Sequence, residues 1–88
     1  MIIANADTIE LAQITRDALL LEIDNEPDPY RRGLRYFYAA ALEVRLGEYD
    51  QARGHATTAE LEFEDSPLPI ANKADPRAFL DQLAEASP

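Results

Sequence analysis

The 88-residue chain contains no cysteine, which excludes disulfide bridges, thiolate metal sites and cysteine nucleophiles. Its first residues, MIIANAD, include no basic segment and no long apolar run, so we expect neither a signal peptide nor a membrane span. Hydrophobic residues nevertheless make up 47% of the chain, which is not a disordered composition. These features predict one small cytoplasmic domain over residues 1–88, with a modest core.

The sequence also lacks the short motifs of common catalytic and cofactor sites. It has no P-loop, no glycine-rich dinucleotide turn and no His-x-x-x-His zinc spacing. No recognisable motif flanks the one histidine, His55, which we expect to be a partly exposed surface residue and not a catalytic base. Acids alternate from Glu22 to Asp28, but Pro27 interrupts them and the glycine of a calcium loop is missing. We therefore expect no enzyme activity, no cofactor and no metal site.

The net charge of −9 is unevenly distributed along the chain. Seven acids and one base give residues 1–30 a charge of −6, and seven acids and two bases give residues 59–88 a charge of −5. Five arginines and three acids give residues 31–58 a charge of +2. Two acidic ends would repel nucleic acid and anionic membrane and attract a basic partner. Ordinary solubility explains the same charge equally well.

The first predicted helix runs from about Thr8 to about Asp24. The segment Asp7-Thr8-Ile9-Glu10 has the spacing of a capping box ahead of an apolar pattern. On a helical wheel the apolar residues form two stripes, one of Leu11, Ile14, Ala18 and Leu21, the other of Ile9, Ala12, Leu19, Leu20 and Ile23. A helix with two apolar faces needs two partners. A homodimer through this helix is one way of supplying the second.

A helical hairpin hinged at Gly47 follows. Asp28 and Pro29 are typical of a helix start and predict a second helix to about Leu46, closed by Gly47 in the left-handed conformation. The run of residues 36–42 is apolar nearly all round, so this should be the most buried helix. The wheel places Leu34, Phe37, Ala40, Ala41 and Val44 on one face, and Arg32, Tyr36, Ala39 and Glu43 opposite.

Two more helices complete the expected all-α fold. A third helix from Tyr49 to Glu64 carries an apolar stripe whose alanines allow a neighbouring helix to approach closely: Tyr49, Ala52, Ala56, Ala59 and Phe63. After a proline-containing connector at residues 65–75, Asp75-Pro76 predicts a fourth helix to about Ala86. The sequence therefore predicts a small four-helix bundle of antiparallel hairpins.

Two segments of the chain match at an offset of forty residues, LEIDNEPDP at 21–29 and LEFEDSPLP at 61–69. This match suggests a two-helix unit used twice, and chance is the alternative because helix exits reuse the same residue types. The segment Leu46-Gly47-Glu48-Tyr49-Asp50-Gln51-Ala52, followed by Ala59, resembles the centre of a tetratricopeptide repeat over about residues 34–63. Ala56 and Glu43 depart from the aromatic and the tyrosine that are usual in that family.

The resemblance implies a protein-binding module. Its register would turn Tyr36, Ala39 and Glu43 toward the partner helix of the hairpin. It would place five residues of the second helix on the groove side: Leu34, Phe37, Tyr38, Ala41 and Arg45.

Three arginines, Arg31, Arg32 and Arg35, crowd the start of the second helix, where the helix dipole disfavours positive charge. One explanation is pairing with Glu26, Asp28 or the acidic end of the first helix. The other is a contact surface for an anion or an acidic peptide, because arginine is enriched at interface hot spots together with tyrosine. Three tyrosines lie near the cluster in sequence: Tyr30, Tyr36 and Tyr38.

Two functions follow from these features. The first is a non-enzymatic protein–protein interaction module, such as an adaptor, a chaperone-like protein or an assembly subunit, that binds through the arginine cluster and the groove side of the second helix. The alternative is a small acidic inhibitor of the immunity, antitoxin, anti-restriction or anti-CRISPR type, which blocks a basic nucleic-acid-binding site. The inhibitor would use the acids of two segments: Glu22, Asp24, Glu26 and Asp28, with Glu60, Glu62, Glu64 and Asp65. Both functions predict a protein partner with a basic surface, and neither predicts direct binding to nucleic acid or membrane.

Overall fold

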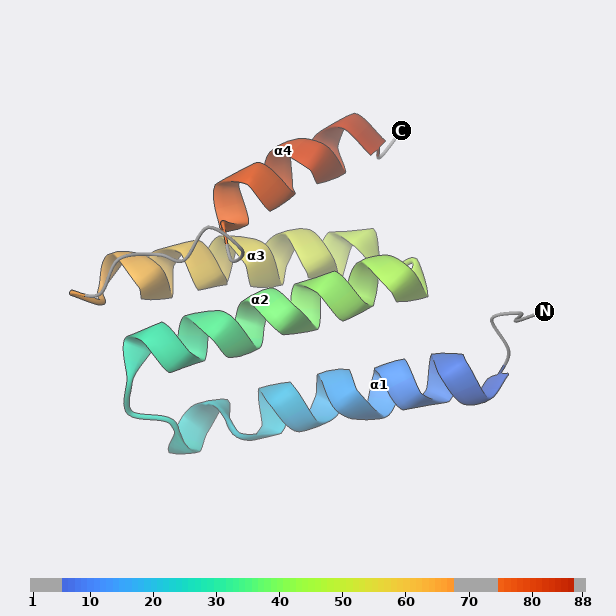
Figure 1. Ribbon diagram of the computed structural model, residues 1–88, viewed down its shortest axis with the longest axis horizontal. Coiled ribbons are helices and arrows are strands. Elements are labelled where there is room, and N and C mark those ends of the chain that lie inside the picture. The colour runs from blue at the N-terminus through green and yellow to red at the C-terminus, as the bar shows by residue number, and fades with distance from the viewer. Residues whose placement is uncertain (1–5, 68–74, 87–88) are drawn as a thin grey trace.

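The computed structural model describes residues 6–67 and 75–86, and this part of the chain is helical, without strands (Figure 1). Its elements are α1 (Ala6–Leu21), the short 3-10 helix η1 (Ile23–Asn25), α2 (Pro29–Leu46), α3 (Tyr49–Glu64) and α4 (Pro76–Ala86). The first three α-helices lie side by side in chain order, and α4 packs on α3. The predicted all-α class and its four helices are therefore confirmed. Among the described helices, none combines the length and the apolar character needed to cross a membrane.

Local caps mark three of the helix ends. Asp28 accepts a hydrogen bond from the backbone N–H of Tyr30 at 3.3 Å, and Asp75 accepts one from that of Arg77 at 3.1 Å. Gly47 closes α2 with a φ of 80°, which is the left-handed region. The predicted bounds of α2, α3 and α4 are confirmed. Most of the predicted connector at 65–75 and the end of the matched segment 61–69 lie outside the described residues.

α1 differs from its predicted bounds at both ends. It begins at Ala6, so that Asp7 lies inside the first turn and not before it. It ends at Leu21, three residues before the predicted end at Asp24. The residues Ile23–Asn25 form η1 instead, and this tighter turn leads into Pro27, which precedes α2.

The core lies between α2 and α3. Four of the five predicted stripe residues of α3 are buried: Ala52, Ala56, Ala59 and Phe63. Tyr49, the first residue of the stripe, is exposed. On the facing side, Gly33 of α2 lies so close to the ring of Phe63 that a Cβ at position 33 would meet it at 2.5 Å. Small residues on both helices therefore allow the close approach that the stripe predicts.

α4 covers the end of this core with two apolar side chains. Phe79 packs on Phe37 with 5.5 Å between ring centroids, and Leu83 is buried beside Ala40. Phe37 is only 9% exposed. It therefore belongs to the core, as the wheel predicts, and its predicted place on a binding groove is wrong.

α2 is buried on more than one side. Ala39 is as fully buried as Ala40, and Glu43 is 1% exposed. The wheel placed Ala39 and Glu43 on the face opposite Phe37 and Ala40, and it favoured burial of the second face alone. That expectation is wrong, because α2 packs against α1 as well as α3 and both faces are buried. The prediction that α2 lies deepest in the fold agrees with this position between two helices.

Candidate functional site

One face of α1 is apolar and uncovered. α1 lies at the edge of the helix array, beyond α2 (Figure 1). Four residues follow one another along its side at intervals of three and four, and we call them the outer stripe: Leu11, Ile14, Ala18 and Leu21. The three large side chains are 64%, 56% and 76% exposed in that order, and Ala18 is also exposed. The outer stripe is the first of the two apolar stripes that the sequence predicts.

The second apolar stripe lies on the side of α1 that packs against α2. Four of its residues are partly buried: Ala12, Leu19, Leu20 and Ile23. Ile9, near the start of the helix, is more exposed. The chain therefore covers one of the two faces that need a partner and leaves the other in solvent.

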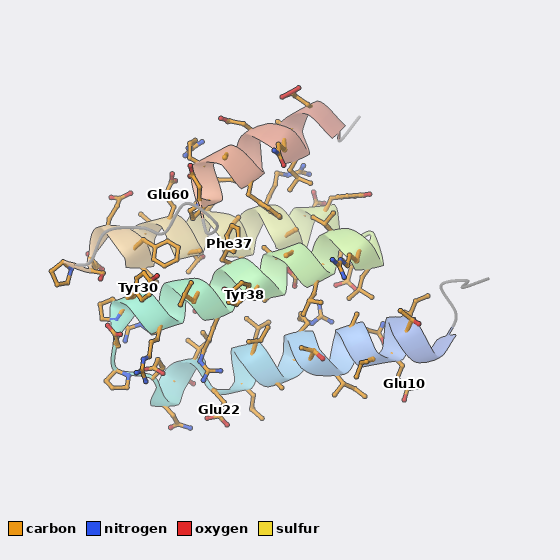
Figure 2. All side chains as sticks on the ribbon, in the orientation of Figure 1. Glu10, Glu22, Tyr30, Phe37, Tyr38 and Glu60 are labelled. Atoms are coloured by element: carbon orange, nitrogen blue, oxygen red, sulfur yellow. The ribbon has the colours of Figure 1, made fainter. Side chains whose placement is uncertain are left out.

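Acidic side chains border the outer stripe. Glu10 and Asp17 lie along one border, and Glu22 follows its last leucine. All three are exposed, and Figure 2 shows Glu10 and Glu22 pointing away from α2. Arg16 is the one basic residue of α1, and it lies on the opposite side of the helix, where it bonds Glu43 of α2. The charge around the outer stripe is therefore negative.

Arg16 joins α1 to the α2–α3 hairpin. Its Nη1 donates to Glu43 Oε2 at 3.1 Å and to Glu48 Oε1 at 2.8 Å, and its Nε donates to Asp17 Oδ1 at 2.6 Å. The hydrogen bonds with Glu48 and Asp17 raise the pKa of Arg16 above its ordinary value. The guanidinium is thus held by three carboxylates, one of them buried.

His55 of α3 bonds the other oxygen of the same buried carboxylate. Its Nδ1 lies 2.7 Å from Glu43 Oε1, and its ring stacks on Tyr36 with 5.9 Å between centroids. A carboxylate only accepts hydrogen bonds, so Nδ1 carries the proton. His55 is partly exposed, as predicted, and within the described residues its hydrogen bonds go to Glu43 alone. Its arrangement is that of a structural partner, because it satisfies a buried charge.

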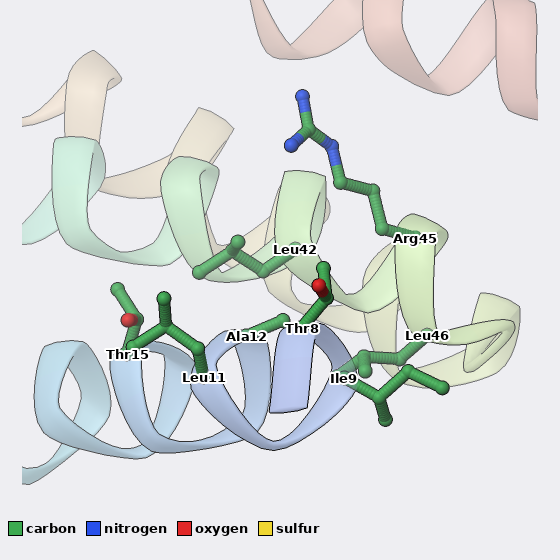
Figure 3. A pocket seen from close by; sticks show the side chains of 8 residues that line it. All are labelled: Thr8, Ile9, Leu11, Ala12, Thr15, Leu42, Arg45 and Leu46. Atoms are coloured by element: carbon green, nitrogen blue, oxygen red, sulfur yellow. The ribbon is translucent and has the colours of Figure 1, made fainter. Parts of the chain in front are cut away.

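A groove runs between α1 and α2 beside the outer stripe (Figure 3). Its wider part has a volume of about 510 Å³ and is lined by Thr8, Ile9, Leu11, Ala12, Thr15, Leu42, Arg45 and Leu46. A smaller adjoining part of about 350 Å³ shares three of these residues and adds Leu19, Tyr38 and Ala41. Leu11 belongs to both the groove and the outer stripe, so the two apolar surfaces are continuous. Figure 3 shows the side chain of Arg45 extending away from α1.

The predicted groove residues of α2 divide between this groove and the core. Tyr38, Ala41 and Arg45 line the groove, and Tyr38 is half exposed. Leu34 is partly buried and packs against the core with Phe37. Sequence reasoning missed Leu42, which lies at the middle of the groove, although it follows Tyr38 by one helical turn.

The arginines at the start of α2 are largely paired inside the chain. Arg32 donates to Glu62 Oε2 at 3.0 Å and to the backbone carbonyl of Glu26 at 2.8 Å, and the bond to Glu62 raises its pKa. Arg31 lies 3.8 Å from Asp28. The predicted pairing is therefore confirmed for Arg31, whereas the carboxylate that pairs with Arg32 is Glu62 of α3, which the sequence did not predict. Two other arginines of α2 have no ion pair among the described residues: Arg35 and Arg45.

The two predicted acidic segments meet at one end of the molecule. Arg32 connects them, because it bonds Glu26 in the loop after α1 and Glu62 near the end of α3. Glu60 pairs with Arg77 of α4 at 2.8 Å. Four carboxylates of these segments have no hydrogen bond or ion pair within the described residues: Glu22, Asp24, Glu64 and Asp65. An exposed acidic surface remains at this end.

The described ranges 6–67 and 75–86 contain no group of three or more His, Asp or Glu side chains placed to hold a metal ion. The tetratricopeptide resemblance stays a prediction. Comparisons of the chain with models of protein families, with curated proteins and with solved structures gave no match.

Proposed function

We propose that the chain is a non-enzymatic protein–protein interaction module that binds another protein through the outer stripe and the adjoining groove. The exposure of Leu11, Ile14 and Leu21 carries this proposal. Full burial of such a side chain contributes about 1.5–3 kcal/mol, and a whole domain is stable by only about 5–15 kcal/mol. If three such residues on one face stay in solvent, the chain forgoes a large part of its possible stability unless another molecule covers them. Contiguous apolar surfaces of this kind typically mark interaction sites.

The position of α1 supports the same function. α1 lies at one edge of the described helix array, in which each helix packs on the next. Helical arrays usually end in a helix with a polar outer face, because that face meets water. The outer face of α1 is apolar instead, as is typical of a helix inside an array. A bound partner would supply the missing neighbour.

The chemistry of the groove supports binding over catalysis. Arg45 is the one charged residue among its described lining residues. General acid–base catalysis needs titratable groups that face the substrate. The buried Glu43 and its partner His55 are already bonded to each other, outside this lining. A mostly apolar groove that opens onto an apolar helix face suits a protein segment.

A matched pair of variants tests the proposed function. Ile14→Asn removes an apolar side chain from the centre of the outer stripe. Leu61→Asn removes one that is 57% exposed on α3, away from the stripe. In affinity capture from the source cells, we expect Ile14→Asn to lose the partner and Leu61→Asn to retain it. A partner retained by both folded variants would contradict the proposed surface.

The acidic inhibitor is the second candidate function, and the meeting of the two acidic segments around Arg32 favours it. Its contact would be the acidic end of the molecule and not the outer stripe. Reversal of two exposed acids that have no partner among the described residues, Asp24→Lys and Glu64→Lys, would then abolish binding, and affinity would fall steeply with salt. Retained binding in this double variant, together with loss in Ile14→Asn, would select the interaction module.

A further inference from the structure

On the basis of the proposed function, we infer that the outer stripe binds an amphipathic helix with basic flanks from another protein, and not a second copy of this chain. The spacing of the stripe indicates a helix as the occupant. Leu11, Ile14, Ala18 and Leu21 occupy alternating a and d positions of a heptad. This 3–4 spacing produces a straight apolar seam, which matches the seam of a second helix lying alongside.

The length of the stripe sets the length of the partner. The ten steps from Leu11 to Leu21 cover about 15 Å of helix axis at 1.5 Å per residue. A partner helix of about three turns covers this seam fully. The groove beside Leu11 adds apolar surface for one flank of such a helix.

The border residues determine the charge of the partner. With Leu11 at position a, Glu10 and Asp17 fall at g positions and Glu22 falls at an e position. Residues at e and g face the flanks of the neighbouring helix, and the charged ones here are all acidic. Arg16 falls at f, farthest from the seam, and its guanidinium bonds Glu43, Glu48 and Asp17. Asp17 is therefore already paired, and Glu10 and Glu22 are the border acids without an ion pair among the described residues. Lysine or arginine on the flanks of the partner therefore complements this surface.

The same borders disfavour a second copy. In an antiparallel pair of α1 helices the g positions face each other, so Asp17 would face Asp17 of the other copy. In a parallel pair g faces e, so Asp17 would face Glu22. Both arrangements place acids opposite each other, with each Asp17 paired only to Arg16 of its own copy, in a chain that already carries a net charge of −9. The homodimer through helix 1 that the sequence suggests is therefore the weaker candidate.

Two designed helical peptides test the inference against the full chain. Both carry leucine at a and d, and one has lysine at e and g where the other has glutamate. In calorimetric titrations at physiological salt we expect the lysine peptide to bind at least about tenfold more tightly than the glutamate peptide. We expect Ile14→Asn to weaken the lysine peptide by at least about tenfold, and Leu61→Asn to leave its affinity unchanged. Sedimentation should show the chain alone to be a monomer.

Each other outcome overturns the inference. If the lysine peptide bound Ile14→Asn as tightly as the unchanged chain, charge attraction alone would explain its binding, without use of the seam. If the glutamate peptide bound as tightly as the lysine peptide, the basic character of the partner would be refuted. A dimer that Ile14→Asn dissociates would show that a second copy occupies the outer stripe. Both results would keep the outer stripe as an interaction surface. Binding of neither peptide would refute the helical occupant. The proposed function itself fails if Ile14→Asn also retains the natural partner in the capture experiment.

Discussion

One oxygen of the buried Glu43 carboxylate lies 2.7 Å from Nδ1 of His55. The other oxygen accepts from Arg16 at 3.1 Å, so a single carboxylate joins α1, α2 and α3. A charge at 1% exposure loses most of its hydration, and only partners on both oxygens offset that loss. The packing of α1 therefore depends on an electrostatic contact as well as on its partly buried second apolar stripe.

We predict that Arg16→Met lowers the free energy of unfolding by about 3 kcal/mol, because it leaves the buried Glu43 carboxylate without its cationic partner. Urea denaturation followed by circular dichroism measures this change. The double variant Arg16→Met/Glu43→Leu should regain most of the loss, since an apolar pair replaces the whole charge pair. A double variant as unstable as the single one would show that the two residues are not energetically coupled.

Gly33→Ala should destabilise the protein although alanine favours helices. The new Cβ would fall 2.5 Å from the ring of Phe63, whose side chain is only 2% exposed. Overpacking of this kind costs about 1–3 kcal/mol, which exceeds the gain in helix propensity of up to about 1 kcal/mol. Thermal unfolding measures the result. The second change Phe63→Leu should cost less in the Gly33→Ala background than alone, and additive effects would argue against the clash.

The other two glycines should respond to alanine with opposite signs. Gly54 is exposed inside α3 with open space around it, so Gly54→Ala should raise the free energy of unfolding by about 1 kcal/mol. Gly47 has a φ of 80°, which strains any residue with a Cβ, so Gly47→Ala should lower it by about 1 kcal/mol. Thermal unfolding of both variants in parallel checks the prediction. Changes of the same sign would contradict the backbone assignment at one of the two positions.

The ends of α2, α3 and α4 were predictable because they depend on residues that are close in sequence. Asp28 caps the backbone N–H two residues on, and Asp75 does the same. The end of α2 depends only on the left-handed conformation of Gly47 itself. The end of α1 was missed because η1 replaces its last turn by a tighter one, and the apolar pattern continues through Ile23 without a break. Local signals therefore determined most of the element bounds.

The candidate site was predictable only in part, because it depends on which helices are neighbours. The outer stripe follows from the wheel of one helix, and its surplus apolar face is visible in sequence. The burial of Glu43 depends on Arg16, which lies 27 residues earlier in another helix. In the sequence, the one indication that Glu43 is buried is its position directly after a long apolar run. The groove likewise exists only once Leu42 meets α1, and the wheel of α2 alone does not show that contact.

The proposed surface also predicts a separation between stability and binding. Ile14→Asn should change the free energy of unfolding by no more than about 0.5 kcal/mol, because the side chain is already 56% exposed in the free chain. Leu83→Asn places the same polar group at a position that is 4% exposed, and should cost about 3 kcal/mol or more. Urea denaturation of both variants measures the two values. If Ile14→Asn were as destabilising as Leu83→Asn, the outer stripe would be covered within the chain itself, and it would not be free for a partner.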